Sequence, residues 1–191
     1  MFHEHARLTG GPGYRWLMPA AEMAGLADGG WPRPPDPATG RAWGPRIATL
    51  SLGADVGSVR AARDFTVAIL RRRGTAERSA DIAIVVSELV TNALRHALGA
   101  SGDTRPRRPI RLGLLQPGPC VLCAVADPSK ATPALRTPGS LAETGRGLHI
   151  ICALSDHWGC TTPNDAGKVV WALFRTRPIP PSGPVPAQAG R

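Results

Sequence analysis

Apolar residues recur every three or four positions between Asp81 and Ala97, which is the spacing of one face of an α-helix. The apolar positions are Ile82, Val86, Leu89, Val90, Ala93, Leu94 and Ala97. A face this broad predicts a helix that presses into the core of the protein rather than one that lies on its surface. We expect the rest of the chain to be organised around this helix.

One polar stripe interrupts the apolar helix. Glu88, Asn92 and His96 follow one another at steps of four, so they lie on the same side of it. Most residues of this kind are simply solvated, and the stripe alone favours that interpretation. Two downstream features favour a binding site instead: a strand-like run that ends in Asp127, and a glycine-flanked helix start further along. Together the three features predict a nucleotide site.

Shorter patterns on both sides of this helix predict the other elements. Alternating or continuous apolar runs separated by Gly- and Pro-containing turns indicate strands, and two more segments have helical spacing. The expected strands cover residues 47–52, 110–115, 121–126, 157–162 and 168–175, and the expected helices cover 56–73, 81–97 and 148–154. This order predicts an α/β (α+β) two-layer sandwich. We expect a mixed, mostly antiparallel sheet covered on one face by about three helices.

Composition divides the chain into three parts. Residues 47–176 form the predicted domain, in which the aperiodic segment 128–144 is expected to be a functional loop that acts as a lid. Residues 1–46 are rich in Gly and Pro and contain Trp, which predicts a flexible extension in which Trp16 to Ala27 could form a short helix; a partner-docking arm is the alternative. Residues 177–191 are a Pro-rich tail that we expect to be disordered.

Length and composition exclude several classes of protein. The 191 residues, 42% of them apolar, suffice for one domain with a substantial core. No apolar run reaches the roughly 18 residues of a membrane span, and the start of the chain lacks the pattern of a secretion signal. These features predict a cytoplasmic protein without a membrane partner.

The net charge of +9 raises nucleic-acid binding as an alternative. Almost all bases are Arg, and with abundant Ala, Gly and Pro this composition resembles the coding bias of a GC-rich genome. One cluster, 71–73, ends a predicted helix, where positive charge complements the helix dipole. The other, between Arg105 and Arg111, lies in a Pro-containing loop without aromatic residues. We therefore expect no direct contact with nucleic acid.

Four cysteines are too few and too irregularly spaced for a disulfide framework. Cys120 and Cys123 have the spacing of a zinc knuckle or a redox pair, but they fall within a predicted strand. Positions three apart in a strand point to opposite faces and cannot easily share a metal or a bridge. We predict buried free thiols.

Three motifs resemble those of the GHKL ATPases, the superfamily of gyrase-type topoisomerases, histidine kinases and anti-sigma-factor kinases. Residues 87–97 resemble the N-box, residues 125–127 the start of the second nucleotide motif, and Gly145-Arg-Gly-Leu148 the glycine box. The chain is most similar to the small bacterial anti-sigma-factor serine/threonine protein kinases and their actinobacterial ATP-binding relatives. The resemblance covers about residues 47–176 and implies the Bergerat ATP-binding fold.

The resemblance implies a role for each motif residue in the use of ATP and Mg²⁺. Asn92 is expected to ligate Mg²⁺ through its side-chain oxygen, and Glu88 to take the proton from an attacking hydroxyl. Asp127 is expected to accept a hydrogen bond from the exocyclic amine of adenine. Gly145 and Gly147 would let the backbone at a helix start approach the phosphates.

The other candidate residues carry alternatives. Arg146 and Lys130 are candidate phosphate contacts, and each could equally be a solvated residue of the lid. Leu148 completes the glycine box, and His149 follows where the family often has another Gly. His96 either orients Asn92 or only packs beside it.

The second motif departs from the family pattern. Where the family usually has Asp-x-Gly-x-Gly, this chain has Asp127-Pro-Ser-Lys-Ala131, so Ser129 and Ala131 replace two glycines that shape the adenine pocket. This departure predicts a weaker or altered nucleotide site.

The resemblance implies an ATP-dependent serine/threonine protein kinase that regulates transcription. Such a protein binds a sigma factor and phosphorylates an antagonist, the anti-anti-sigma protein. The altered second motif keeps open the alternative of a non-catalytic or weakly ATP-binding partner-switching module. The sequence does not identify the sigma factor or the antagonist, and it leaves open whether the domain forms a homodimer.

Overall fold

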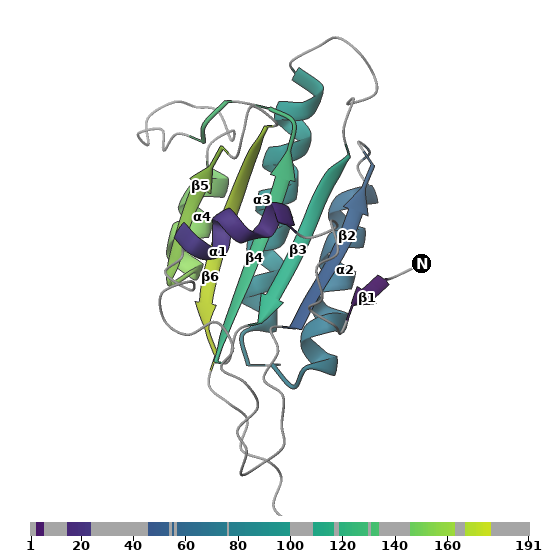
Figure 1. Ribbon diagram of the computed structural model, residues 1–191, viewed down its shortest axis with the longest axis vertical. Coiled ribbons are helices and arrows are strands. Elements are labelled where there is room, and N and C mark those ends of the chain that lie inside the picture. Colours follow the sequence, from purple (N-terminus) through teal and green to yellow (C-terminus); the bar gives the residue numbers. More distant parts are fainter. Residues whose placement is uncertain are drawn as a thin grey trace, which may run out of the picture.

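A six-stranded sheet forms the framework of the protein, with its strands in the order β1-β2-β3-β4-β6-β5 (Figure 1). The structure is a computed structural model that describes residues 3–5, 15–23, 46–53, 55, 57–75, 77–99, 109–116, 119–129, 131–133, 146–162 and 167–176. The strands are β1 (His3–His5), β2 (Arg46–Leu52), β3 (Ile110–Gln116), β4 (Cys120–Asp127), β5 (His157–Thr161) and β6 (Lys168–Arg175). All pairings between these strands are antiparallel.

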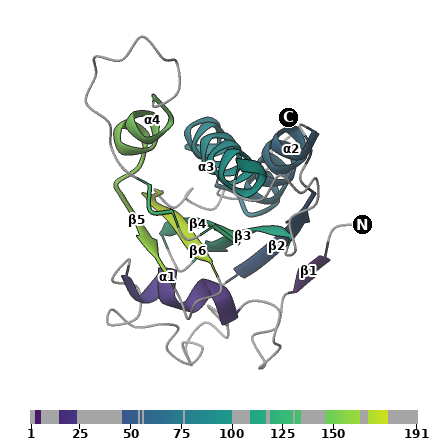
Figure 2. The same cartoon turned by 90° about the horizontal axis from the view of Figure 1, so that it is seen from above.

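Helices lie on both faces of this sheet. On one face lie α2 (Gly57–Arg72), α3 (Ser79–Gly99) and α4 (Arg146–Leu154), and on the other lie the 3-10 turn η1 (Arg15–Leu17) and α1 (Met18–Met23) (Figure 2). The predicted sandwich, a mostly antiparallel sheet with about three helices on one face, is confirmed. None of the helices in the described ranges combines the length and the apolar character needed to cross a bilayer.

The central helix α3 lies where its pattern predicted. The positions predicted for its apolar face, from Ile82 to Leu94, are all buried in a cluster shared with α2, α4 and the helix-side residues of the sheet, whereas Ile84, off that face, is exposed. Glu88 and Asn92, on the polar stripe, are only partly buried. Because the apolar face of α3 packs against the sheet, its polar stripe faces α4 and the ends of the neighbouring strands.

Arg78 fixes the start of α3 to the far edge of the sheet. Its guanidinium donates to Asp156 Oδ2 at 2.7 Å and to the Leu154 carbonyl at 2.6 Å, and it lies over the ring of Phe174 at 5.2 Å. Burial opposes ionisation of Asp156, but the Arg175 N–H and the Arg78 charge outweigh it and lower the pKa of Asp156. This junction sets α3, α4 and β6 relative to one another, and all three contribute to the site described below.

A second apolar cluster lies on the opposite face of the sheet. Leu17, Ala20 and Ala21 are almost completely buried there against residues of β2, β3, β4 and β6. The short helix expected near Trp16 is therefore present and packed, and the Trp16 ring lies 5.6 Å from the Arg111 guanidinium. Residues 1–46 also supply β1, which pairs with β2. The other parts of 1–46, the 177–191 tail and most of the expected lid lie outside the described residues, so the predictions for them and the domain boundaries stay predictions.

Truncating Leu17 to alanine should lower the free energy of unfolding by about 2–4 kcal/mol, because the side chain is fully buried and its removal leaves a cavity. Leu17 fills the space above Gly113, where even an added Cβ would lie 2.6 Å from a Leu17 methyl group. Urea denaturation measures the effect. Ile84→Ala, a similar truncation at a residue that is 38% exposed, is the control and should cost much less. Equally small losses of unfolding free energy in both variants would show that the packing of Leu17 does not contribute to the stability of the fold.

The cysteines of the described sheet follow the strand geometry expected from their spacing. Cys123 is buried in the helix-side cluster, whereas Cys120 packs against the cluster on the other face. All four cysteines are free, as predicted, but only Cys123 is fully buried, and Cys152 is exposed. Burial raises the pKa of the Cys123 thiol, so it is an inert core residue.

Candidate functional site

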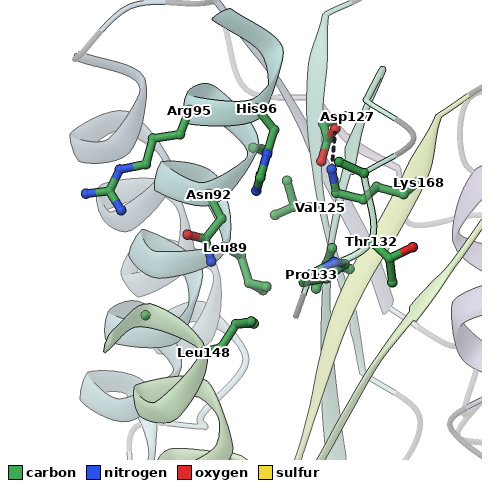
Figure 3. Close-up of a pocket in the computed structure, with 14 residues that line it drawn as sticks. Leu89, Asn92, Arg95, His96, Val125, Asp127, Thr132, Pro133, Leu148 and Lys168 are labelled. Atoms are coloured by element: carbon green, nitrogen blue, oxygen red, sulfur yellow. Dashed lines mark hydrogen bonds and ion pairs between the residues drawn. The ribbon is translucent and has the colours of Figure 1, made fainter. Parts of the chain in front are cut away.

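A cavity of about 390 Å³ opens between the polar stripe of α3 and the ends of β4 and β6 (Figure 3). Its size is that of a small-molecule pocket. Helix α3 supplies Leu89, Asn92, Ala93, Arg95 and His96, the strands supply Val125, Asp127, Lys168 and Val170, and α4 supplies Gly147 and Leu148. Residues 131–133 complete the wall. The cavity therefore has apolar walls with polar groups at opposite sides.

On the helix side, the first turn of α4 lies directly against the polar stripe. A Cβ added to Gly147 would lie 2.7 Å from Glu88 Oε2 and 3.5 Å from the Asn92 amide oxygen and nitrogen. Any side chain at position 147 would therefore displace the Glu88 carboxylate and would touch the Asn92 amide. The close approach brings a carboxylate, an amide and the free N–H groups of a helix start together. Such a helix start attracts anions such as phosphate.

On the strand side, Asp127 and Lys168 form a buried ion pair. Their side chains are only 1% and 2% exposed, and Lys168 Nζ lies 3.0 Å from Asp127 Oδ1. The two residues are directly opposite each other in the register of β4 and β6. Gly167 precedes Lys168 with a φ of +113°, and a Cβ there would collide with the backbone of Asp127 and Pro128. Glycine at 167 thus allows the strands to meet closely enough for the pair to form.

Opposing effects act on the Asp127 carboxyl. Burial is the largest and raises its pKa, while the Lys168 ammonium, the Ser129 N–H at 2.8 Å and the charge of His96 act in the opposite direction. The net direction is upward. Lys168, Ser129 and His96 therefore favour the charged form of the Asp127 carboxyl, and burial opposes it.

Comparison with known proteins places this site in a family. Residues 52–174 match the family model of the histidine kinase-like ATPase domain, which is more than half of the chain. The chain belongs to the histidine kinase-like ATPase family. Membership of this family implies ATP binding, in agreement with the resemblance of the N-box and glycine box. Among curated proteins, none matches the chain significantly.

Two solved structures share the fold of this ATPase domain. One contains the RsbU and RsbW domains of Rv1364c from Mycobacterium tuberculosis, with 21% identity and a TM-score of 0.51 over 68% of this chain. This chain spans only 32% of that protein. The other is the SiaB-SiaC complex from Pseudomonas aeruginosa, with 11% identity and a TM-score of 0.52 over 66% of this chain and 88% of the matched chain. At these identities the likeness shows the fold alone.

The groups of the site fit a nucleotide with its metal ion. The carboxylate and amide oxygens of Glu88 and Asn92 are hard donors suited to Mg²⁺, which proteins usually hold by one or two such oxygens together with phosphate. Gly147 leaves the space beside them that a side chain would fill. The apolar walls formed by Leu89, Val125 and Val170 suit the faces of a purine ring.

The structure brings together most of the residues predicted for the ATPase site. Asn92, His96, Asp127, Gly147 and Leu148 line the cavity. In Figure 3, His96 projects from α3 toward Asp127, while Arg95 points away from the strands. Their individual roles in binding stay predictions.

The remaining predicted site residues lie elsewhere or beyond the described part. Glu88 lies at the edge of the site against Gly147 and does not itself line the cavity. Arg146 is exposed at the first position of α4 and is not among the lining residues. Gly145 and Lys130 fall outside the described residues. Both expected phosphate contacts, Arg146 and Lys130, therefore stay predictions without a described contact to the cavity.

Lys168 is the main site residue that sequence reasoning missed. A signal was available: Lys168 is the one charged residue at the start of an otherwise apolar strand, where a lysine is almost never buried without a partner. Ala131 also lines the cavity, which places one of the departures from the glycine pattern at the site itself.

Proposed function

We propose that this protein is an ATP-dependent serine/threonine protein kinase of the anti-sigma-factor type that acts in the cytoplasm. It regulates transcription by binding a sigma factor and by phosphorylating an antagonist protein. One observation carries the proposal: Glu88, Asn92 and the start of α4 at Gly147 meet at one side of a cavity whose other side holds Asp127. A proton acceptor, a metal ligand and an anion-binding helix start are the groups that phosphoryl transfer requires.

In this proposal each of the site residues has a distinct task. Bound Mg-ATP supplies the phosphoryl group. Asn92 holds the metal ion, and the N–H groups at the start of α4 hold phosphate oxygens. Glu88 accepts the proton of the attacking serine or threonine hydroxyl, whose oxygen forms the new bond to phosphorus while the bond to the leaving ADP oxygen breaks.

The partners are proposed from likeness in fold. One structural relative is described as a protein with RsbU and RsbW domains, and the other was solved as the SiaB-SiaC complex. One relative thus carries a second domain and the other was solved in a complex with another protein. Likeness in fold to these two proteins supports a protein, rather than a metabolite, as the phosphate acceptor. A homodimer, in which two copies present two such sites, is compatible with this proposal.

Calorimetry with ATP, with and without Mg²⁺, tests the nucleotide part of the proposal. We expect saturable binding that Mg²⁺ strengthens, and Asn92→Ala should remove most of the Mg²⁺ effect while weaker metal-free binding persists. Thr91→Ala, a truncation of the neighbouring α3 residue, whose hydroxyl bonds to the Ser87 carbonyl, is the control and should keep the Mg²⁺ effect. A Mg²⁺ effect of the same size in Asn92→Ala would remove Asn92 as the metal ligand.

A non-catalytic partner-switching module is the second candidate. The observation that favours it is the Asp127–Lys168 ion pair, which already occupies the carboxylate expected to receive adenine. In this case the protein would bind its partner without transferring phosphate. Incubation with labelled Mg-ATP and a candidate antagonist separates the two, since only the kinase transfers label to the antagonist.

A further inference from the structure

Lys168 is a charged side chain buried at the wall of the cavity. It is 2% exposed, and its Nζ contacts Asp127 Oδ1 at 3.0 Å (Figure 3). Both residues line the cavity. Taking an ammonium group out of water is costly, and the cost is offset only if its hydrogen-bonding capacity is met.

Within the part of the chain that the structure describes, the hydrogen bonds of this pair do not use all of its donors. An ammonium group carries three N–H donors. Among the described residues, Asp127 Oδ1 is the one acceptor that lies within hydrogen-bond distance of Lys168 Nζ. The same oxygen also accepts the Ser129 N–H at 2.8 Å. With respect to the described ranges, Lys168 thus has further donors beside the carboxylate, at a cavity whose walls include apolar residues such as Val125 and Val170.

A donor next to a carboxylate recognises a particular ligand edge, one that presents an acceptor next to a donor. The six-amino edge of adenine has this pattern, because the exocyclic amine is flanked by the ring nitrogens N1 and N7. We propose that Lys168 is a base-recognition residue. Asp127 accepts a hydrogen bond from the exocyclic amine, and Lys168 donates one to a ring nitrogen beside that amine. This inference rests on the proposed ATP site and adds to it a second determinant of base specificity.

The buried pair gives this recognition its strength. A hydrogen bond from a charged donor is stronger than a neutral one, and the burial of both side chains limits competition from water. Removal of the ring acceptor would leave the Lys168 donors facing a C–H group, which costs affinity because a buried donor loses its partner. A lysine that served only to neutralise Asp127 would not distinguish between ring nitrogen and ring C–H.

Base analogues provide the test, with affinity measured by calorimetry on the full chain. ATP, 1-deaza-ATP and 7-deaza-ATP differ only in whether a ring nitrogen or a C–H flanks the amine. We expect one of the two deaza analogues to bind the wild-type protein about 10-fold or more weakly than ATP. In Lys168→Met the same analogue should bind within about twofold of ATP, because the donor is gone. Arg175→Met, which removes a positive charge from the exposed end of the same strand, should keep the wild-type discrimination.

The outcomes separate this inference from the function on which it rests. If ATP binds and both deaza analogues bind as tightly as ATP, Lys168 does not donate to a ring nitrogen. The inference is then wrong, although the proposed ATP site stands. If Lys168→Met weakens all three nucleotides by one common factor and keeps the discrimination between them, Lys168 acts on the phosphates or on the fold, which also overturns the inference. If ATP itself does not bind the wild type, the nucleotide proposal fails and this inference fails with it. The wild-type series needs no variant, so a folding defect in Lys168→Met does not obscure the result.

Discussion

Replacing Glu88 by glutamine should lower phosphate transfer to the antagonist by about 10²–10⁴-fold while ATP affinity stays within about twofold. Glutamine keeps the size of the side chain next to Gly147 and removes only its capacity to accept a proton. The structure favours this substitution over alanine, because a truncation would open space beneath the start of α4. Transfer is measured with labelled Mg-ATP and the purified antagonist, and affinity by calorimetry.

Glu77→Gln is the matched control for this prediction. Glu77 undergoes the same chemical change at an exposed position before α3, so it should transfer phosphate at the wild-type rate. Wild-type transfer by Glu88→Gln would exclude Glu88 as the base. Loss of both transfer and ATP binding would instead assign Glu88 to binding, together with Asn92.

Replacing Asp127 by asparagine should destabilise the fold by about 3–5 kcal/mol, because it leaves the buried Lys168 charge without its partner. Urea denaturation measures the loss. The double variant Asp127→Asn/Lys168→Met removes both charges and should recover much of it. Asp64→Asn, at the exposed Arg60–Asp64 pair of α2, is the control and should have almost no effect. A double variant as unstable as the single one would mean that packing, not charge, holds this part of the sheet.

The same ion pair makes a prediction about pH. Lys168→Met removes one of the charges that lower the pKa of Asp127, so the burial that raises it acts with less opposition. An acid with a raised pKa in the folded state stabilises the fold in full below its unfolded pKa of about 4, and loses this contribution as pH rises through the folded value. Lys168→Met should therefore be more destabilised relative to wild type at pH 8 than at pH 5. A pH-independent difference would show that Asp127 stays charged without Lys168.

Much of the fold could be predicted from local pattern. The three-or-four spacing from Ile82 to Leu94 located α3 and its buried face, and period and turn residues located the strands from β2 to β6. The prediction of a mixed sheet was less specific than the structure, in which the described pairings are all antiparallel. Strand order is not a local property, and only the structure shows β6 between β4 and β5.

The candidate site divides in the same way. Asn92 and Glu88 could be found because they are four residues apart on one helix, and Gly147 because it opens another. Lys168 stood out as a charge at the start of an apolar strand, but its partner could not be assigned, because Asp127 is 41 residues away and nothing in either segment alone specifies the register that joins them. The packing of Leu17 on the face of the sheet opposite α3 could not be predicted either, since the pattern predicted a short helix but not the surface that it covers.

By itself, the sequence determined which residues share a helix face and which strand ends in an acid, because side-chain direction follows directly from the helical and extended repeats. Tertiary structure decided which of these groups meet. Gly147 lies against Glu88 and Asn92, and Lys168 lies against Asp127, because burial of the apolar faces of α3 and the sheet fixes the positions of α4 and β6. Contacts between distant segments depend on how those faces pack, and no local repeat encodes that packing.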